Sequence, residues 1–67
     1  TRVDFALNQV VLHTLPGSAQ AVAFAIDHAK WSEIIGTLAG DDTILLIARS
    51  EADVQDVLKR ISNLMKD

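Results

Sequence analysis

Cysteine is absent from this 67-residue sequence, and histidine occurs only twice, as His13 and His28. Without thiols the chain can form no disulfide scaffold and no cysteine-ligated metal site, and thiol catalysis is excluded. The two histidines show neither HxH nor HExxH spacing, which disfavours a zinc site built from this chain alone. We therefore expect neither disulfides nor a metal to stabilise the fold.

Basic residues are also few. Lys and Arg number 6 against 9 Asp and Glu, a net charge of −3, and their scatter along the chain disfavours direct DNA binding. The sequence has no apolar run near the roughly 20 residues of a membrane span, and its first residues lack the plan of a signal peptide. We expect a cytoplasmic protein with no membrane partner. A chain that opens on Thr1 is expected to be a fragment, with something missing upstream.

What the sequence does have is apolar content. Hydrophobic residues make up 49% of the chain and charged residues 22%, as in ordinary globular proteins. A chain of this size forms one domain, here residues 1–67, and buries only about 60% of the surface that it exposes when unfolded. Such a domain is marginally stable alone, so oligomerisation is expected to supply the missing stability.

The first half of the chain predicts a hairpin and a helix. Residues 3–7 alternate apolar and polar or small side chains, with Val3, Phe5 and Leu7 on the apolar face, and residues 10–15 suit a second strand that pairs back after Asn8 and Gln9. Pro16-Gly17-Ser18 then ends the strand pattern. The alanine-rich segment that follows predicts a helix to about residue 29, because alanine has the highest helix propensity.

The second half repeats this order. Residues 34–39 and 43–48 predict two strands joined by Gly40-Asp41-Asp42, and a helix starts at Ser50 with Asp53 near a capping box. Its apolar positions recur at helical spacing at Val54, Val57, Leu58, Ile61, Leu64 and Met65. The expected fold is α+β, a two-layer β-β-α-β-β-α arrangement whose four-stranded, mainly antiparallel sheet carries both helices on one face.

The strand at 43–48 is unusual because all its residues from Ile44 to Ala48 are apolar. Two short helices can cover only one face of the sheet, so a neighbouring chain is expected to cover the other. The alternative is a central strand in a two-layer monomer with some exposed apolar residues.

Catalytic signatures are missing. The sequence contains no G-x-S-x-G context, and its glycines, Gly17, Gly36 and Gly40, form neither G-x-G-x-x-G nor a Walker motif. The two histidines suit structural positions in a strand and at a helix end, where a cation favours the helix dipole. We expect no catalytic residues and no enzyme activity.

The segment Gly36-Thr37-Leu38-Ala39-Gly40-Asp41-Asp42-Thr43 places two adjacent carboxylates between two apolar strands. Turn chemistry explains it, since Gly and Asp favour turns. A cation site explains it too, because a guanidinium matches a carboxylate with two donors at once. Gln20 and Asp27, seven residues apart on one helix face, are either its solvated side or ligands for a cationic amino acid.

The runs from His13 to Gln20 (HTLPGSAQ) and from Gly36 to Thr43 (GTLAGDDT), with Asp27 between them, resemble the C-terminal domain of bacterial arginine repressors. The similarity covers essentially the whole chain. The resemblance implies a transcriptional regulator of arginine biosynthesis or catabolism, whose missing N-terminal winged helix-turn-helix domain binds DNA. It also implies a homo-oligomer, in which trimers pair into hexamers and the corepressor L-arginine binds between the trimers, with no other cofactor and no metal.

The resemblance also assigns the site. Gln20 and Asp27 on the first helix, and Asp41 and Asp42 in the loop, fall on the family's arginine contacts, with one of the paired aspartates contacting arginine held by the opposite trimer. The pocket is lined, partly through backbone, by Ala19, Thr37 and Ala39. Ser18, Val22 and Phe24 lie at variable positions, so the rim of the pocket is not inferred from them.

Two rival functions stay open at this point. A ligand-independent oligomerisation module predicts constitutive assembly with no response to arginine. An enzyme on the same plan, of the pterin carbinolamine dehydratase type, would need clustered histidines, for which His13 and His28 are poor candidates. By resemblance, the arginine sensor ranks first.

Overall fold

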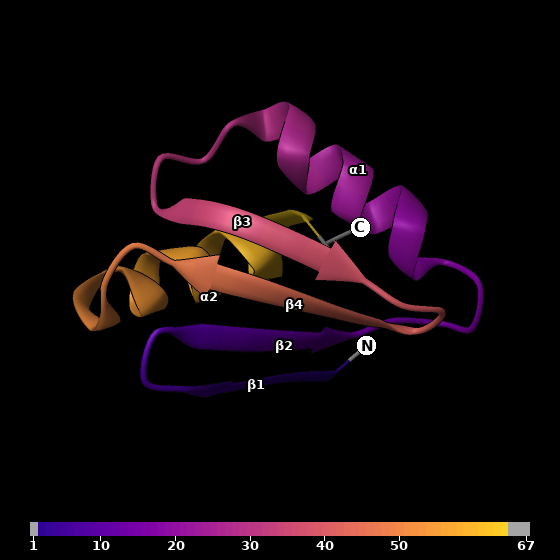
Figure 1. The fold of residues 1–67 in the computed structure, drawn as a ribbon, viewed down its shortest axis with the longest axis horizontal. Helices are drawn as coiled ribbons and strands as arrows, with labels where there is room; N and C mark the ends of the chain where they lie inside the picture. Colours follow the sequence, from indigo (N-terminus) through magenta and orange to yellow (C-terminus); the bar gives the residue numbers. More distant parts are fainter. Residues whose placement is uncertain (1, 65–67) are drawn as a thin grey trace.

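The computed structural model describes residues 2–64 and shows a four-stranded antiparallel sheet with two helices, in the order β-β-α-β-β-α (Figure 1). The strands lie in the order β1-β2-β4-β3, so β2 and β4 are central and β1 and β3 form the edges. The elements are β1 Arg2–Ala6, β2 Gln9–His13, α1 Ala19–Ala29, β3 Ile34–Ala39, β4 Thr43–Ala48, the 3₁₀ turn η1 Glu51–Asp53, and α2 Val54–Leu64. Within residues 2–64, neither helix is long and apolar enough to cross a membrane.

Both helices pack on the same face of the sheet, which confirms the expected two-layer α+β fold. Helix α1 contacts β3 and β4, and α2 contacts β2; Figure 1 shows α2 behind the sheet and α1 along its β3 side. The alternating residues of the central strands that face the helices are buried, together with the apolar stripe of each helix. This single core comprises Val10, Leu12, Ala19, Ala23, Ile26, Ile44, Leu46, Ala48, Val54, Val57 and Ile61.

The second half of the sequence folds as its pattern predicts. Strands β3 and β4 have the expected bounds, and residues 40–42 connect them. The helix differs at its start: the Ser50 hydroxyl donates to the Asp53 carboxylate over 3.1 Å but makes no capping bond to a backbone N–H, and η1 follows it, so α2 begins at Val54 rather than at Ser50. Of the expected apolar stripe of α2, Leu58 is half-buried, Leu64 is exposed, and Met65 lies outside the described residues.

The first hairpin differs from its prediction in register. Its turn is Leu7-Asn8 rather than Asn8-Gln9, because β1 ends at Ala6 and Ala6 pairs with Gln9. Leu7, expected on the apolar face, lies in the turn with φ +56° and is 72% exposed. Asn8 is half-buried instead: its backbone oxygen accepts from the Ala48 N–H at 2.8 Å, and its side-chain amide donates to the Ala48 carbonyl at 3.2 Å. These hydrogen bonds to β4 fix the turn at Leu7-Asn8, a position that the local sequence does not predict.

The second strand is shorter than predicted. It ends at His13, because the Thr14 N–H leaves the sheet ladder and donates to the Asp42 carbonyl at 2.7 Å. Leu15, expected in the strand, lies beyond it and is 64% exposed. The end of β2 is therefore fixed by the loop that joins β3 and β4.

The face of the sheet opposite the helices is apolar along its centre. Val11, Leu45 and Ile47 alternate with the buried core residues of β2 and β4 and are half-buried. Leu38 pairs with Leu45 on this face and is 72% exposed. We call Val11, Leu38, Leu45 and Ile47 the open sheet face; among the described residues no helix covers it. The expected apolar character of both faces of β4 is confirmed.

An ion pair between the largely buried Glu33 and the partly exposed Arg60 fixes the loop between α1 and β3. The Arg60 guanidinium of α2 donates twice to Glu33 Oε2, from Nε at 3.3 Å and from a terminal nitrogen at 3.1 Å. The Glu33 side chain is only 14% exposed, and the Arg60 Cζ lies 5.7 Å from the centroid of the Trp31 ring. This cluster joins the second helix to the end of the first.

The ion pair between Glu33 and Arg60 should make the stability of the fold depend on pH in the acid range. A hydrogen bond from its own backbone, reinforced by Arg60, lowers the pKa of Glu33 from its ordinary value of 4.5. The folded state therefore gains stability from ionised Glu33 at pH above about 4.5, and loses that gain as pH falls through the lowered pKa. We expect Glu33→Gln to lower the melting temperature at pH 7, and the gap to wild type to narrow as the pH falls below 4.5 and the Glu33 carboxylate of the wild type becomes protonated. Thermal melts of wild type and Glu33→Gln at several pH values measure this difference, and Glu51→Gln, at an exposed residue, is the control. A difference in melting temperature that stays constant with pH would contradict the prediction.

Candidate ligand-binding site

The two sequence motifs meet through backbone hydrogen bonds at the start of α1. The Asp41 carbonyl accepts from the N–H groups of Gly17 at 3.0 Å and Ala19 at 3.3 Å. Gly17 has φ +84°, which glycine adopts without strain and which turns the chain so that its N–H points at the loop. With the bond from Thr14 to Asp42, three backbone donors of residues 14–19 bind the carbonyls of the two aspartates.

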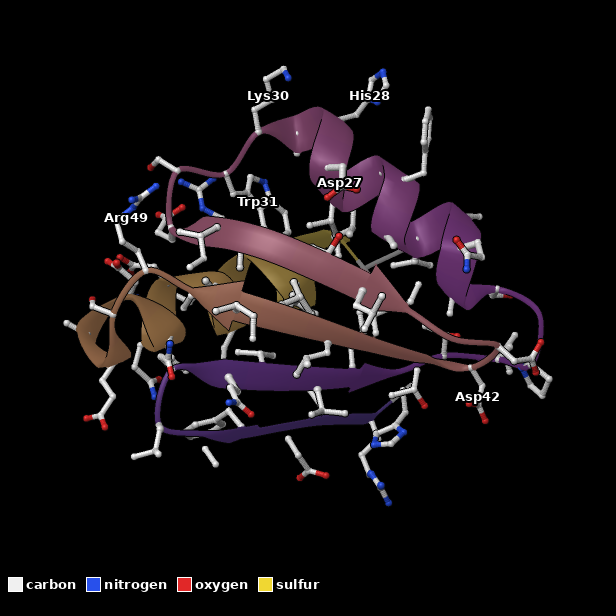
Figure 2. All side chains as sticks on the ribbon, viewed as in Figure 1. Asp27, His28, Lys30, Trp31, Asp42 and Arg49 are labelled. Carbon is white, nitrogen blue, oxygen red and sulfur yellow. The ribbon has the colours of Figure 1, made fainter. Side chains whose placement is uncertain are left out.

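The carboxylate groups of Asp41 and Asp42 therefore take no part in the backbone hydrogen bonds that join this loop to residues 14–19. Asp41 and Asp42 are both exposed, and Asp42 accepts a local bond from the Thr43 hydroxyl at 3.0 Å. Figure 2 shows the Asp42 side chain at the tip of the β3–β4 hairpin, directed away from α1. The backbone of the loop thus makes the contacts with residues 14–19, while both aspartates are exposed.

A cavity of about 660 Å³ lies between α1 and β3, a size typical of small-molecule sites. We call it the α1–β3 cavity. Its walls combine polar groups with apolar and aromatic surface, and they are formed by Gln20, Ala21, Ala23, Phe24, Asp27, Thr37, Leu38 and Ala39.

Two hydrogen bonds tie α1 to β3 across this cavity. The Gln20 side-chain amide donates to the Ala39 carbonyl at 3.2 Å, and the Thr37 hydroxyl donates to Asp27 Oδ1 at 2.9 Å. The seven-residue spacing of Gln20 and Asp27 puts them two helical turns apart on one face, as expected from the sequence. Figure 2 shows Asp27 on the side of α1 that faces β3. Thr37 orients the carboxylate and occupies only one of its oxygens, so Oδ2 remains to accept from a ligand.

The electrostatics of the site are negative. Within residues 2–64 the ion pairs are Arg2–Asp4 and Arg60–Glu33, and none involves the three aspartates Asp27, Asp41 and Asp42. The described residues also bring no three His, Asp or Glu side chains into a possible metal site. Carboxylates without a protein cation, beside neutral amide and hydroxyl groups, suit an organic cation with several N–H donors.

A second cavity, of about 470 Å³, lies between α1 and the end of α2. It is lined mostly by apolar side chains, including Leu12, Leu15, Val22 and Leu64, with Thr14 and Ser18 as polar neighbours. None of its lining residues carries a charge, so it does not suit a cationic amino acid. The α1–β3 cavity is the better candidate for such a ligand.

The structure brings together part of the site expected from the sequence. Gln20, Asp27, Thr37 and Ala39 line one cavity. Ala19 is fully buried in the core, where only its backbone reaches the loop. Asp41 and Asp42 do not line the cavity of their own chain, so a role for their carboxylates at the same ligand would need a second subunit. Their assignment stays a prediction.

Sequence reasoning left Phe24 out of the site, yet it lines the cavity and is 64% exposed. Its ring contacts His28 one turn later, with ring centroids 4.5 Å apart and planes inclined at 37°. The signal that could have found it is spacing: Phe24 lies four residues after Gln20 and three before Asp27, so all three share a helix face.

Comparison with known proteins identifies the family of the chain. Residues 1–63 match the family model described as "Arginine repressor, C-terminal domain". The chain belongs to the arginine repressor family. It is similar to the arginine repressors of Desulfitobacterium hafniense (56% identical over 64 residues, 96% of this chain and 43% of that protein) and of Exiguobacterium sp. (48% over 63 residues, 94% and 42%). The arginine repressor of Bacillus velezensis is 44% identical over 64 residues, 96% of this chain and 43% of that protein.

The chain spans less than half the length of these relatives, so the family membership established here concerns the C-terminal domain. The arginine repressor family comprises transcriptional regulators and not enzymes, which sets the dehydratase-type alternative aside.

Proposed function

We propose that this chain is the L-arginine-sensing and oligomerisation domain of a cytoplasmic, arginine-dependent transcriptional regulator of arginine metabolism. L-arginine is its corepressor, and an N-terminal winged helix-turn-helix domain, outside residues 1–67, binds DNA. The single observation that carries the proposal is the α1–β3 cavity, where Asp27 is held by Thr37 with an acceptor oxygen left over. A free amino acid with a guanidinium group supplies the N–H donors that such a carboxylate accepts.

The second part of the proposal concerns assembly. Chains form trimers that pair into hexamers, with arginine between the trimers, where Asp41 or Asp42 of one trimer contacts arginine held mainly by the other. Two features support it: the exposure of these two aspartates on a loop docked by its backbone, and the apolar open sheet face. Covering that face with a second copy would provide the stability that a 67-residue chain lacks alone.

Charge couples the binding of arginine to the assembly of hexamers. Three aspartates per chain repel one another across a shared interface, and arginine converts this repulsion into charge-assisted hydrogen bonds of about 1.5–3 kcal/mol each. Arginine therefore tightens the hexamer, and by linkage the hexamer tightens arginine binding to the same degree.

Citrulline provides the test of this function. It keeps the shape of arginine but carries a neutral ureido group, so the loss of one charge-assisted contact should weaken its binding by at least about tenfold. Isothermal calorimetry of the chain with each ligand measures the ratio. Equal affinities would contradict the carboxylate–guanidinium assignment, and no binding of arginine would contradict the proposed function and favour a ligand-independent oligomerisation module.

A further inference from the structure

We propose that Phe24 is a specificity-determining residue of the α1–β3 cavity, whose ring faces the cationic group of the ligand and favours a guanidinium by a cation–π contact. The inference rests on the proposed arginine-binding function. It adds an aromatic contact surface for the ligand, which the carboxylate and amide groups of the cavity do not provide. It assigns a role to the most exposed aromatic side chain in residues 2–64.

Phe24 lies on the face of α1 that lines the cavity. Gln20 precedes it by four residues and Asp27 follows it by three, so the ring stands between the two polar groups of α1 that line the cavity. Thr37 and Ala39 lie on the opposite wall, on β3. Phe24 and Asp27 therefore line the same cavity from one helix, opposite the β3 wall.

The contact with His28 is the second argument. The two rings pack with centroids 4.5 Å apart, and His28 is not among the residues that line the cavity. Figure 2 shows His28 directed away from the sheet. The histidine thus restrains the phenylalanine ring from outside the cavity, and a restrained ring loses less conformational freedom when a ligand stacks on it.

The chemistry of the ligand is the third argument. A guanidinium is planar, delocalised and weakly hydrated, so it stacks on an aromatic face while its N–H groups bind carboxylates in its own plane. Asp27 offers such an acceptor from the same helix. An ammonium can use the carboxylate equally well but stacks less favourably, and a neutral ureido group lacks the charge that the ring attracts.

Substitutions at Phe24 separate this contact from simple apolar packing. Phe24→Leu keeps an apolar side chain but removes the aromatic face, whereas Phe24→Trp offers the aromatic group that binds cations best. A matched control is Phe5→Leu, since Phe5 is also exposed, at 52%, but lies on β1 outside the cavity. Isothermal calorimetry with L-arginine compares the four proteins, and circular dichroism checks that each is folded.

The expected result is a loss of arginine affinity of about three- to tenfold in Phe24→Leu, affinity equal to or above wild type in Phe24→Trp, and no change in Phe5→Leu. Wild-type affinity in Phe24→Leu would overturn the role of Phe24 and leave the proposed function standing. Equal losses in Phe24→Leu and Phe24→Trp would also overturn it, because the residue would then act through shape alone. Failure of the wild-type chain to bind arginine would overturn both proposals together.

Discussion

Asp27→Asn is expected to lower the affinity for L-arginine by about ten- to a hundredfold without unfolding the chain. The substitution keeps the size of the side chain and an oxygen that can accept from the Thr37 hydroxyl, which now lies 2.9 Å from Asp27 Oδ1. It removes the negative charge, and hydrogen bonds to a charged group contribute about 1.5–3 kcal/mol. Isothermal calorimetry measures the loss, and a thermal melt shows that the fold is retained.

Two further variants show whether the loss is local. Asp56→Asn removes one exposed carboxylate from α2, outside the cavity, and should leave arginine affinity unchanged. Thr37→Val keeps the Asp27 charge but removes the hydroxyl that orients it, so a loss of only a few-fold is expected. Asp27→Asn with wild-type affinity would remove Asp27 from the site.

Asp41→Asn and Asp42→Asn are expected to abolish most of the effect of arginine on assembly while leaving the chain folded. The loop docks through the backbone oxygens of these residues, which accept from Thr14, Gly17 and Ala19, and asparagine retains those oxygens. The carboxylates are exposed, so their charge acts between chains rather than within one. Removing it reduces both the repulsion between trimers and the attraction of the ligand.

The double variant makes the sharpest version of this test. Asp41→Asn/Asp42→Asn should associate at least as strongly as wild type without arginine, and gain little when arginine is added. Sedimentation equilibrium gives both quantities, and circular dichroism reports the fold. An unfolded chain would show that the two residues serve the turn, and an undiminished response to arginine would exclude both carboxylates from the interface.

The second hairpin was predictable from the sequence because its signals are local. The apolar runs of β3 and β4 are bounded by Gly40-Asp41-Asp42, and each strand has the expected ends. The turn of the first hairpin was not predictable, because Leu7 continues the alternating pattern of β1. Its place in the turn depends on bonds between Asn8 and Ala48, 40 residues away, and no local pattern contains that information.

The site was predictable to a similar extent. Helical periodicity alone brings Gln20 and Asp27 to one face, and the structure confirms that they line one cavity. Their partners on β3, the Thr37 hydroxyl and the Ala39 carbonyl, depend on the packing of α1 against the sheet. The docking of the Asp41-Asp42 loop uses backbone atoms, which every residue type shares, so no side-chain pattern could show it.

Sedimentation velocity of the chain with and without saturating L-arginine reports ligand binding and assembly together, and so tests whether the two are coupled. We expect arginine to shift the distribution from trimers toward hexamers, and citrulline at the same concentration to leave it unchanged. A distribution that is the same with and without arginine would contradict the coupling of ligand to assembly, and a monomer under all conditions would contradict the role of the open sheet face as an interface.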